Sequence, residues 1–280
     1  MLIDMHTHIW RYPGHLSDEL HEEANRMRSE PRSWDAPPEA HRAAMSAADR
    51  VIVFGLRAPH TGIDVPNDFI ADYVRSDPAK LIGFLSVDPY RDDVESEIER
   101  GVQALGLRGI KLGPTYQGYH PHDPKADPIF ARASALNLPI LLHQGATFPR
   151  KAELEQSRPI LLEKIALKYP DLVMVIAHLG HPWEEETIVL IRKQPNLYAD
   201  ISALFYRPWQ MYNSLRLAYE YGAMHKLLFG TDWPVAGIEE TIEGLKKVCE
   251  MAQRANLPEL PWEKIEEIIY RDSLSLLRLQ

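Results

Sequence analysis

Short apolar runs alternate with longer segments of helical spacing from one end of the chain to the other. Each run is rich in leucine or β-branched residues and is followed by turn residues. This alternation predicts a parallel sheet with helical crossovers. Eight repeats in 280 residues fit a closed α/β fold, the (β/α)8 TIM barrel, better than an open sheet. The predicted strands cover residues 2–8, 51–56, 81–87, 109–112, 140–143, 172–178, 197–201 and 227–230.

The intervening segments carry helix signals, and we expect one domain over residues 1–280. Residues 11–38, with their Glu, Arg and Pro content, are expected to form an elaborated loop after the first strand. An open, doubly wound sheet is less well supported, because residues 4–8 stand where a glycine-rich phosphate-binding turn would be needed. The predicted helices cover residues 18–28, 39–48, 68–75, 92–105, 128–136, 159–168, 184–193, 212–221 and 238–255.

Charge and cysteine content exclude several classes of partner. The chain has 40 acidic and 31 basic side chains and a net charge of -9, which argues against binding to nucleic acid or anionic membranes. Its single cysteine, Cys249, cannot form an intramolecular disulfide, so we expect a cytoplasmic protein. The chain opens in strand-like alternation, so no leader peptide is expected. The expected partner is a small-molecule substrate, and a homo-oligomer is left open.

Histidines and one aspartate recur where predicted strands end. His6 and His8 lie two residues apart on the first strand, so both point to the same side. Alone, such a pair is about as readily explained by coincidence or by core hydrogen bonding. His143 ends the fifth strand, His178 ends the sixth and Asp232 follows the eighth, all at the rim where barrel enzymes carry their chemistry. This combination predicts a metal site.

Nitrogen donors with one carboxylate suit a divalent metal ion. We favour zinc, with manganese or iron as alternatives. Three histidines and an aspartate that shifts between metal and water would leave an open coordination position, which indicates catalysis and not a purely structural role.

Four motifs together resemble the amidohydrolase superfamily. They are Asp4-Met5-His6-Thr7-His8, Leu142-His143-Gln144-Gly145, Ala177-His178-Leu179-Gly180 and Gly230-Thr231-Asp232-Trp233-Pro234. More narrowly, the chain resembles the amidohydrolase-related branch, with its aminocarboxymuconate semialdehyde decarboxylase and resorcylate decarboxylase relatives. The resemblance spans the whole chain. It implies a TIM barrel in which His6, His8, His143 and Asp232 ligate the metal, while His178 and Asp232 take part in catalysis.

Lys111 leaves the number of metal ions open. It lies on the fourth predicted strand, where binuclear members of the superfamily carry a carboxylated lysine that bridges two metals. The narrower branch is typically mononuclear, and such a lysine can instead bind a substrate carboxylate. We favour one metal ion.

Other residues near the predicted rim are weaker candidates. Trp10 and Trp233 are the best-placed aromatic residues for contacting substrate, although core packing is the favoured explanation for each of them. Arg57 and Arg207 are the cationic candidates for holding an anionic group. His41, in a predicted helix, is expected to be exposed to solvent.

The motifs imply an enzyme with two candidate reactions. The first is hydrolysis, in which a metal-bound water attacks an amide, lactone or ester carbonyl. The second is non-oxidative decarboxylation of an aromatic or unsaturated carboxylic acid. Both reactions need the same metal ligands. Many decarboxylases of the branch that this chain resembles are somewhat longer, so the length of the chain slightly favours hydrolysis. A catalytically silent metal-binding barrel is a further alternative from a different class.

Overall fold

The computed structural model describes residues 1–26 and 28–280, and each predicted barrel strand is present in it. The barrel strands are parallel, as the alternating pattern predicted. They are β1 (Ile3–His8), β2 (Arg50–Phe54), β5 (Leu81–Phe84), β6 (Ile110–Leu112), β7 (Ile140–Leu142), β8 (Met174–Ile176), β9 (Leu197–Asp200) and β10 (Leu227–Leu228).

These strands follow one another around a barrel. One sheet has the order β1-β2-β5 and the other has the order β10-β9-β8-β7-β6. Parallel bridges join the two sheets at both edges: Leu85 pairs with Ile110, and Thr7 pairs with Trp233. Backbone hydrogen bonds strengthen the second seam, where the Met5 amide donates to the Phe229 carbonyl at 3.1 Å. The (β/α)8 TIM-barrel prediction is confirmed.

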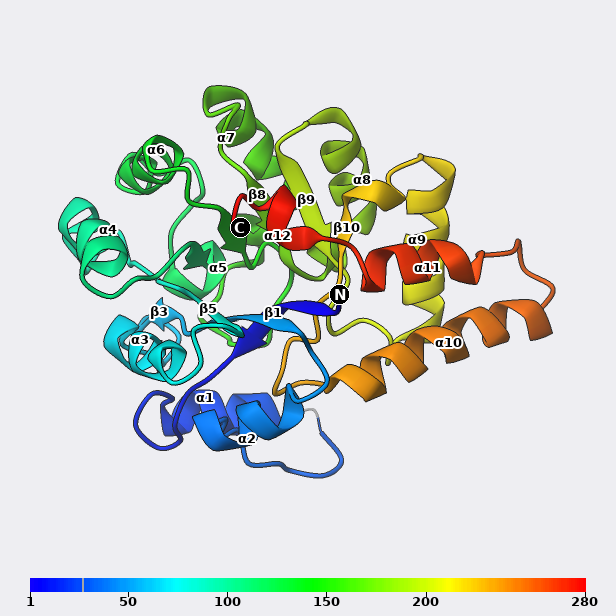
Figure 1. Ribbon diagram of the computed structural model, residues 1–280, viewed down its shortest axis with the longest axis horizontal. Coiled ribbons are helices and arrows are strands. Elements are labelled where there is room, and N and C mark those ends of the chain that lie inside the picture. Colours follow the sequence, from blue (N-terminus) through cyan, green and yellow to red (C-terminus); the bar gives the residue numbers. More distant parts are fainter. Residues whose placement is uncertain (27) are drawn as a thin grey trace.

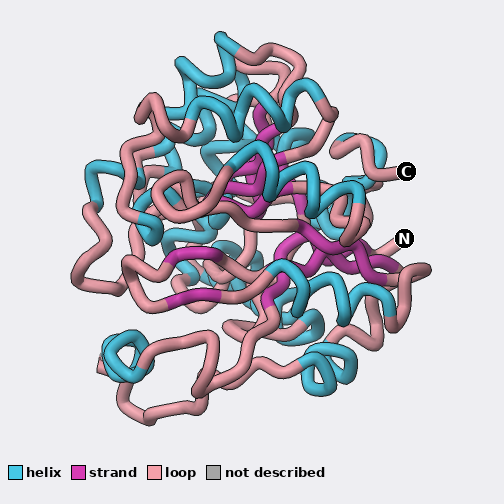
Figure 2. The backbone as a smooth tube through the Cα atoms, turned by 90° about the vertical axis from the view of Figure 1, so that its left-hand side faces the viewer, coloured by secondary structure: helices cyan, strands magenta, loops and turns pink. Residues whose placement is uncertain are grey.

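Helices surround the strands, as the two views in Figures 1 and 2 show. Each predicted helix is found, usually within a few residues of its expected ends. The predicted helix over 18–28 includes residue 27, which lies outside the described residues. The helices predicted from the sequence are α1 (Asp18–Asn25), α2 (Pro38–Ala44), α3 (Asn67–Arg75), α4 (Val94–Gln103), α6 (Asp127–Ala135), α7 (Leu162–Lys168), α8 (Glu184–Lys193), α9 (Pro208–Glu220) and α10 (Ile238–Arg254).

The structure adds several short elements that the sequence patterns did not single out. A small antiparallel pair, β3 (Arg57–Ala58) and β4 (Ile63–Asp64), follows β2. Three further helices are α5 (Pro114–Gln117), α11 (Trp262–Ile269) and α12 (Ser273–Leu276). Short 3-10 helices cover Leu154–Ser157, Pro159–Leu161, Ala177–Gly180 and Met224–Lys226.

The interior of the barrel is a packed core that is closed at one end by the C-terminal segment. Inward-facing strand residues such as Met5, Phe54 and Phe84 are buried there. Leu274 and Leu277 of the C-terminal segment join the same cluster, and Figure 1 shows α12 close to the N-terminus. Because this segment packs at the amino ends of the strands, the carboxyl ends are left for chemistry.

The segment between β1 and α2 packs over the carboxyl end of β1. The Ser17 side chain caps α1 by accepting a hydrogen bond from the Leu20 amide, and Asp18 and Glu19 favour the positive end of the helix. Trp10 pairs with Ala36 in an isolated antiparallel bridge, which ties the two ends of the loop together. The described part of the expected elaborated loop therefore includes α1.

In the part of the chain that the structure describes, no helix combines the length and apolar character needed to cross a bilayer.

Candidate metal centre

The candidate metal-binding side chains come from four strand ends. His6 and His8 lie on β1, His143 follows β7 and Asp232 follows β10. His178 lies in the turn directly after β8. Because the strands run parallel around the barrel, their carboxyl ends face the same opening.

Asp232 lies at the centre of this group. Its Oδ1 is 3.2 Å from Nε2 of His6 and 3.3 Å from Nε2 of His8. Its Oδ2 is 3.9 Å from Nε2 of His178. One donor atom each from His6, His178 and Asp232 lie within 4.8 Å of one another, a spacing that allows them to hold one ion. The two β1 histidines thus direct the same ring nitrogen at one carboxylate.

His143 lies beside this group. Its ring centroid is 5.2 Å from that of His178 and 4.9 Å from that of Tyr116. Its Nε2 is 3.3 Å from the carbonyl oxygen of Ala146, so this nitrogen is engaged by the loop that follows β7. The structure therefore brings His143 to the site but not into the tightest donor cluster.

Asp200, at the end of β9, is a site residue that the sequence reasoning missed. Its Oδ2 lies 2.8 Å from Nδ1 of His6. Its Oδ1 accepts hydrogen bonds from the His178 amide at 3.0 Å and from the Ser202 amide at 3.1 Å. A carboxylate that accepts from Nδ1–H fixes the tautomer of His6 and leaves the lone pair on Nε2, which faces Asp232. The signal available in the sequence was an aspartate near the end of the predicted strand 197–201.

Burial keeps His6, His8 and His143 neutral. It lowers the pKa of His6 to about 3 and the pKa of His8 and His143 well below the ordinary value, and the positive charge of Lys111 acts in the same direction. Burial alone would raise the pKa of Asp200, but its interactions with His6, His178 and Ser202 hold that pKa well below the usual range.

This set of donors fits a divalent metal ion. Neutral imidazoles keep the lone pair that a cation needs, and His6 has its lone pair oriented by Asp200. Asp232 adds one carboxylate with 14% of its side chain exposed, next to fully buried His6. Imidazole nitrogen with a single carboxylate suits zinc, manganese or iron.

Lys111 on β6 is the buried cation of the site. Its Nζ lies 3.3 Å from Nε2 of His6 and 4.6 Å from the ring centroid of Phe54. Burial lowers its pKa to about 7, although the charges of Asp232 and Asp200 act in the opposite direction. The amino group therefore faces the same point as the candidate ligands.

Two candidate site residues have a strained backbone. Asp232 has a φ of 60° and His178 a φ of 54°, both in the left-handed region. Residues other than glycine are uncommon there, and each costs about 1–3 kcal/mol. Such strain persists only where surrounding contacts hold it, and it is concentrated at functional sites.

A cavity opens at this point, with polar residues from the strand ends and apolar residues from the loops. The polar residues are His8, Lys111, His143, His178 and Asp232. The rest of the lining is apolar or aromatic except for His21: Trp10, Leu16, Leu20, Ala24, Trp34, Leu56, Ile63, Tyr116, Phe148 and Val235.

The weaker candidates fall in different places. Trp10 lines the cavity, with its ring centroid 5.2 Å from that of His8. Trp233 packs edge-on against His41 with a centroid distance of 5.1 Å and lies outside the cavity lining. Arg57 pairs with Asp64 at 2.5 Å and with Asp92 at 3.4 Å. Arg207 stacks over the ring of Tyr206. Neither arginine lines the cavity.

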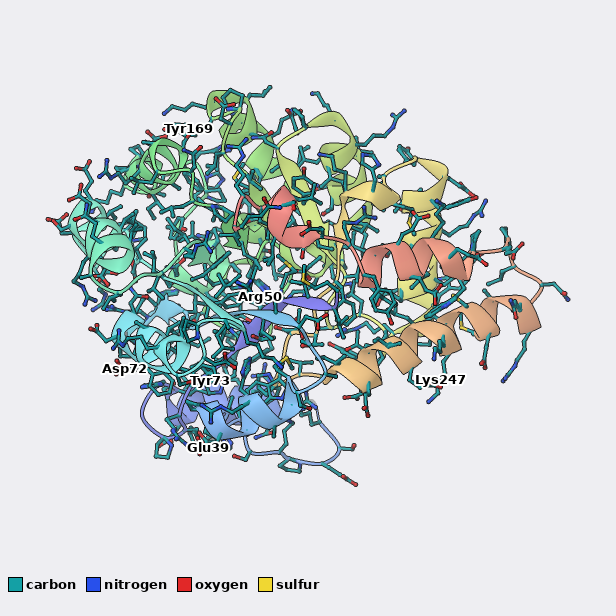
Figure 3. All side chains as sticks on the ribbon, viewed as in Figure 1. Glu39, Arg50, Asp72, Tyr73, Tyr169 and Lys247 are labelled. Atoms are coloured by element: carbon teal, nitrogen blue, oxygen red, sulfur yellow. The ribbon has the colours of Figure 1, made fainter. Side chains whose placement is uncertain are left out.

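His41 is buried, so the expectation that it is exposed to solvent is wrong. Its Nε2 lies 2.8 Å from Oγ1 of Thr7, and its Nδ1 lies 2.8 Å from the Tyr73 hydroxyl. Figure 3 places Tyr73 on α3, beside the helices that follow β1. Thr7 sits between the two β1 histidines and donates to the Ile52 carbonyl. His41 therefore links α2 and α3 to the strand that carries His6 and His8.

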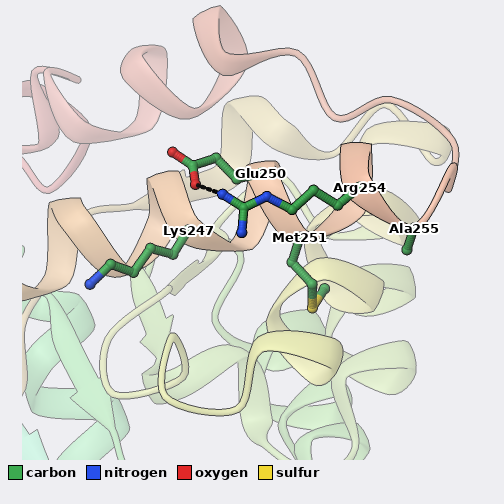
Figure 4. Close-up of a pocket in the computed structure, with 5 residues that line it drawn as sticks. All are labelled: Lys247, Glu250, Met251, Arg254 and Ala255. Atoms are coloured by element: carbon green, nitrogen blue, oxygen red, sulfur yellow. Dashed lines mark hydrogen bonds and ion pairs between the residues drawn. The ribbon is translucent and has the colours of Figure 1, made fainter.

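A second hollow lies on the exposed side of α10 and offers no comparable group. Figure 4 shows its lining, which comes from α10 and Ala255. Glu250 and Arg254 pair with each other at 3.0 Å. No candidate site residue is found there, so the strand-end cavity is the candidate active site.

Comparisons with known proteins show the family of this chain and its fold. The model of the family described as "Amidohydrolase" matches residues 3–268. A curated relative is the 2-amino-3-carboxymuconate-6-semialdehyde decarboxylase of Dictyostelium discoideum, which is 33% identical over 98 residues. That alignment covers 33% of this chain and 27% of the relative, so the chain matches only about a quarter of the relative's length.

Solved structures share the fold over the whole chain. A probable 2-pyrone-4,6-dicarboxylic acid hydrolase from Acinetobacter baumannii has a TM-score of 0.70 at 16% identity, covering 99% of both chains. A dihydroxybenzoic acid decarboxylase from Polaromonas, with bound manganese, has a TM-score of 0.64 at 16% identity, covering 99% of this chain and 97% of that one. An amidohydrolase from Burkholderia multivorans, with bound zinc, has a TM-score of 0.69 at 16% identity, covering 100% of both chains.

Proposed function

This chain belongs to the amidohydrolase family of metal-dependent enzymes, and we propose that it catalyses the non-oxidative decarboxylation of an aromatic or unsaturated carboxylic acid. The proposed enzyme is a single domain over residues 1–280. Its proposed partner is a small molecule, as is the case for the relatives solved with bound ligands.

The main support for this proposal is the difference in polarity between two parts of the cavity lining. Polar groups are concentrated at the strand ends, and most of the remaining lining is apolar. A carboxylate that leaves as carbon dioxide loses its charge. Apolar surroundings that exclude water destabilise the charged carboxylate relative to the uncharged carbon dioxide, and so favour decarboxylation. Decarboxylases also occur among both the curated relatives and the similar structures.

We propose that His6, His8, His143 and Asp232 hold one divalent ion, with zinc favoured over manganese and iron. The ion would supply a Lewis acid that holds the substrate's carboxylate and a neighbouring oxygen. Donor atoms of His6, His178 and Asp232 lie within 4.8 Å of one another, which supports an ion at this place.

His178 is the proposed proton carrier. Its Nδ1 lies 2.8 Å from Oγ and 3.2 Å from the carbonyl oxygen of Ser202, so this nitrogen can donate to the carbonyl. Nε2 then carries the lone pair and faces the cavity beside Asp232. In the reaction the carbon–carbon bond to the carboxylate breaks, and its electron pair stays on the substrate carbon. His178 takes up a proton from solvent on Nε2 and passes it to that carbon.

Lys111 is the proposed contact for the substrate carboxylate. Its Nζ is buried beside His6, where an ammonium group can pair with one negative charge. The alternative is a carboxylated Lys111 that bridges two metal ions. The mass of the intact protein separates these, because carboxylation adds the mass of carbon dioxide to the chain.

Hydrolysis, the reaction that the sequence placed first, is the second candidate. It is supported by the closeness of Asp232 and His178, whose Oδ2 and Nε2 atoms are 3.9 Å apart and could share the proton of an attacking water. The fold similarity to a probable hydrolase is consistent with it. In this reaction Asp232 would pass the proton to the leaving group.

One assay separates the two reactions. Metal-loaded protein is incubated with a panel of hydroxybenzoates, lactones and amides, while carbon dioxide release and pH drift are followed. Carbon dioxide from a hydroxybenzoate, lost in His178→Asn, is the expected result. Hydrolysis of a lactone or amide with no carbon dioxide from any acid would overturn the decarboxylase proposal.

A further inference from the structure

The wall of the cavity that α1 contributes is mainly apolar. Leu16, Leu20 and Ala24 are spaced four residues apart, so they form one apolar stripe along α1 and the residues before it. This stripe lines the cavity together with Trp34, from the same segment between β1 and α2. Among the described residues of this segment that line the cavity, His21 is the one that is neither aliphatic nor tryptophan.

His21 is turned toward its own segment. Its ring stacks on Tyr12 with a centroid distance of 4.1 Å and an interplanar angle of 7°. Of the cavity-lining side chains, Lys111 is therefore the one that carries a cationic amine, and it lies at the strand ends next to His6.

The guanidinium groups of three arginines near the cavity contact other protein groups. Arg32 donates to the Pro234 carbonyl, and both Arg28 and Arg32 lie over the ring of Trp34, at 4.8 and 4.6 Å from its centroid. Arg57 is held by two aspartates. Hence none of these guanidinium groups lines the cavity to meet a second anionic group of a substrate.

We propose that this site selects acids with a single negative charge and an apolar, aromatic body, and that the α1 stripe Leu16, Leu20 and Ala24 sets this selectivity. The inference rests on the proposed function, since it takes the substrate's carboxylate to lie at the strand ends. A second carboxylate would then lie against the stripe, whose Leu16 and Leu20 are buried, and an unpaired charge is costly there. Aromatic side chains at Trp10, Tyr116 and Phe148 suit a flat ring.

Binding measurements test this without depending on turnover. The probes are 2-hydroxybenzoate, 4-hydroxybenzene-1,3-dicarboxylate, which adds a second carboxylate to the same ring, and 2-hydroxy-5-methylbenzoate, which adds a methyl group at the same position. Affinities for the metal-loaded protein are measured by calorimetry. We expect the second carboxylate to weaken binding at least about 30-fold and the methyl group to be tolerated. Equal affinity for the mono- and dicarboxylate, or binding of neither, would overturn the proposal.

A variant locates the selectivity on α1. Ala24→Lys places a cation on the stripe, at a residue that is only partly buried and in a helix that accepts lysine well. It should reduce the preference for the monocarboxylate at least about tenfold, while the matched uncharged variant Ala24→Met keeps it. An unchanged preference in Ala24→Lys would contradict the role of α1. Carbon dioxide assays on the same proteins are read separately: selective binding without decarboxylation would count against the proposed reaction and leave the selectivity intact.

Discussion

Oδ2 of Asp200 lies 2.8 Å from Nδ1 of His6, and both side chains are fully buried. The same aspartate accepts a hydrogen bond from the backbone amide of His178 through its other oxygen. One carboxylate at the end of β9 thus orients a candidate ligand and positions the residue proposed to carry the proton.

Replacing Asp200 should weaken metal binding. Asp200→Asn removes the negative charge that holds His6 in the tautomer with its lone pair on Nε2, so we expect a loss of about 10–100-fold in metal affinity. Competition with a chromogenic chelator measures it. Asp88→Asn, at a buried carboxylate outside the cavity lining, is the matched control and should bind metal like the wild type. Equal loss in both variants would mean a general structural effect.

His178 should be needed for turnover and not for holding the ion. His178→Asn is expected to lower kcat by about 10²–10⁴-fold, the usual contribution of a positioned proton carrier, with metal content unchanged. Turnover and metal content are measured on the same preparation. Parallel loss of the ion would place His178 among the ligands, in line with its closeness to His6 and Asp232. Full turnover with bound metal would show that His178 is not the proton carrier.

Lys111 should matter for acid binding but not for folding. Lys111→Met removes a buried charge, so its free energy of unfolding should equal or exceed that of the wild type, while the affinity for 2-hydroxybenzoate falls at least about tenfold. Lys226→Met is the matched control. Lys226 is another buried lysine, and its Nζ donates to the carbonyls of Pro195 and Leu197. The control should lower stability and leave acid binding unchanged; the reverse pattern would refute the assignment.

His41 should make stability depend on pH. Burial, aided by the charges of Lys80 and Arg42, lowers its pKa from 6.5 to about 3. Between these values the unfolded chain binds a proton that the folded chain does not, so stability falls as pH falls through this window. The loss from this one group is about 2 kcal/mol between pH 7 and pH 5.

The comparison with His41→Gln isolates this effect. Denaturant unfolding of metal-free wild type and variant is followed at pH 7, 6 and 5, so that release of the ion does not contribute. The variant should be less stable at pH 7, because it disturbs the hydrogen bonds to Thr7 and Tyr73, and the difference should shrink toward pH 5. Parallel curves for the two proteins would show that His41 titrates normally in the folded state.

The barrel was predictable because each of its strands is marked by a short local pattern in the sequence. Apolar runs such as 140–143 and 197–201 are recognisable within a few residues, and a parallel closed sheet sends their carboxyl ends to one opening. Period-two alternation also placed His6 and His8 on one side, and the structure directs both at Asp232.

Residues that act through distant partners were not predictable in this way. Asp200 faces the far nitrogen of His6, a contact across 194 residues, so it did not resemble a metal ligand. His41 is buried by Thr7, Tyr73 and Trp233, which come from three other parts of the chain. The apolar spacing of Leu16, Leu20 and Ala24 predicts a helix face, but a pattern does not tell whether that face meets the core or a cavity.

The metal content of the purified protein tests the central claim most directly. Protein saturated with zinc or manganese and then freed of excess ion is analysed for metal per chain, together with His6→Ala and Asp232→Ala. We predict one ion per wild-type chain and well below one in either variant, with turnover lost on chelation and restored by adding the ion. No bound ion in the wild type, or undiminished content in both variants, would contradict the account.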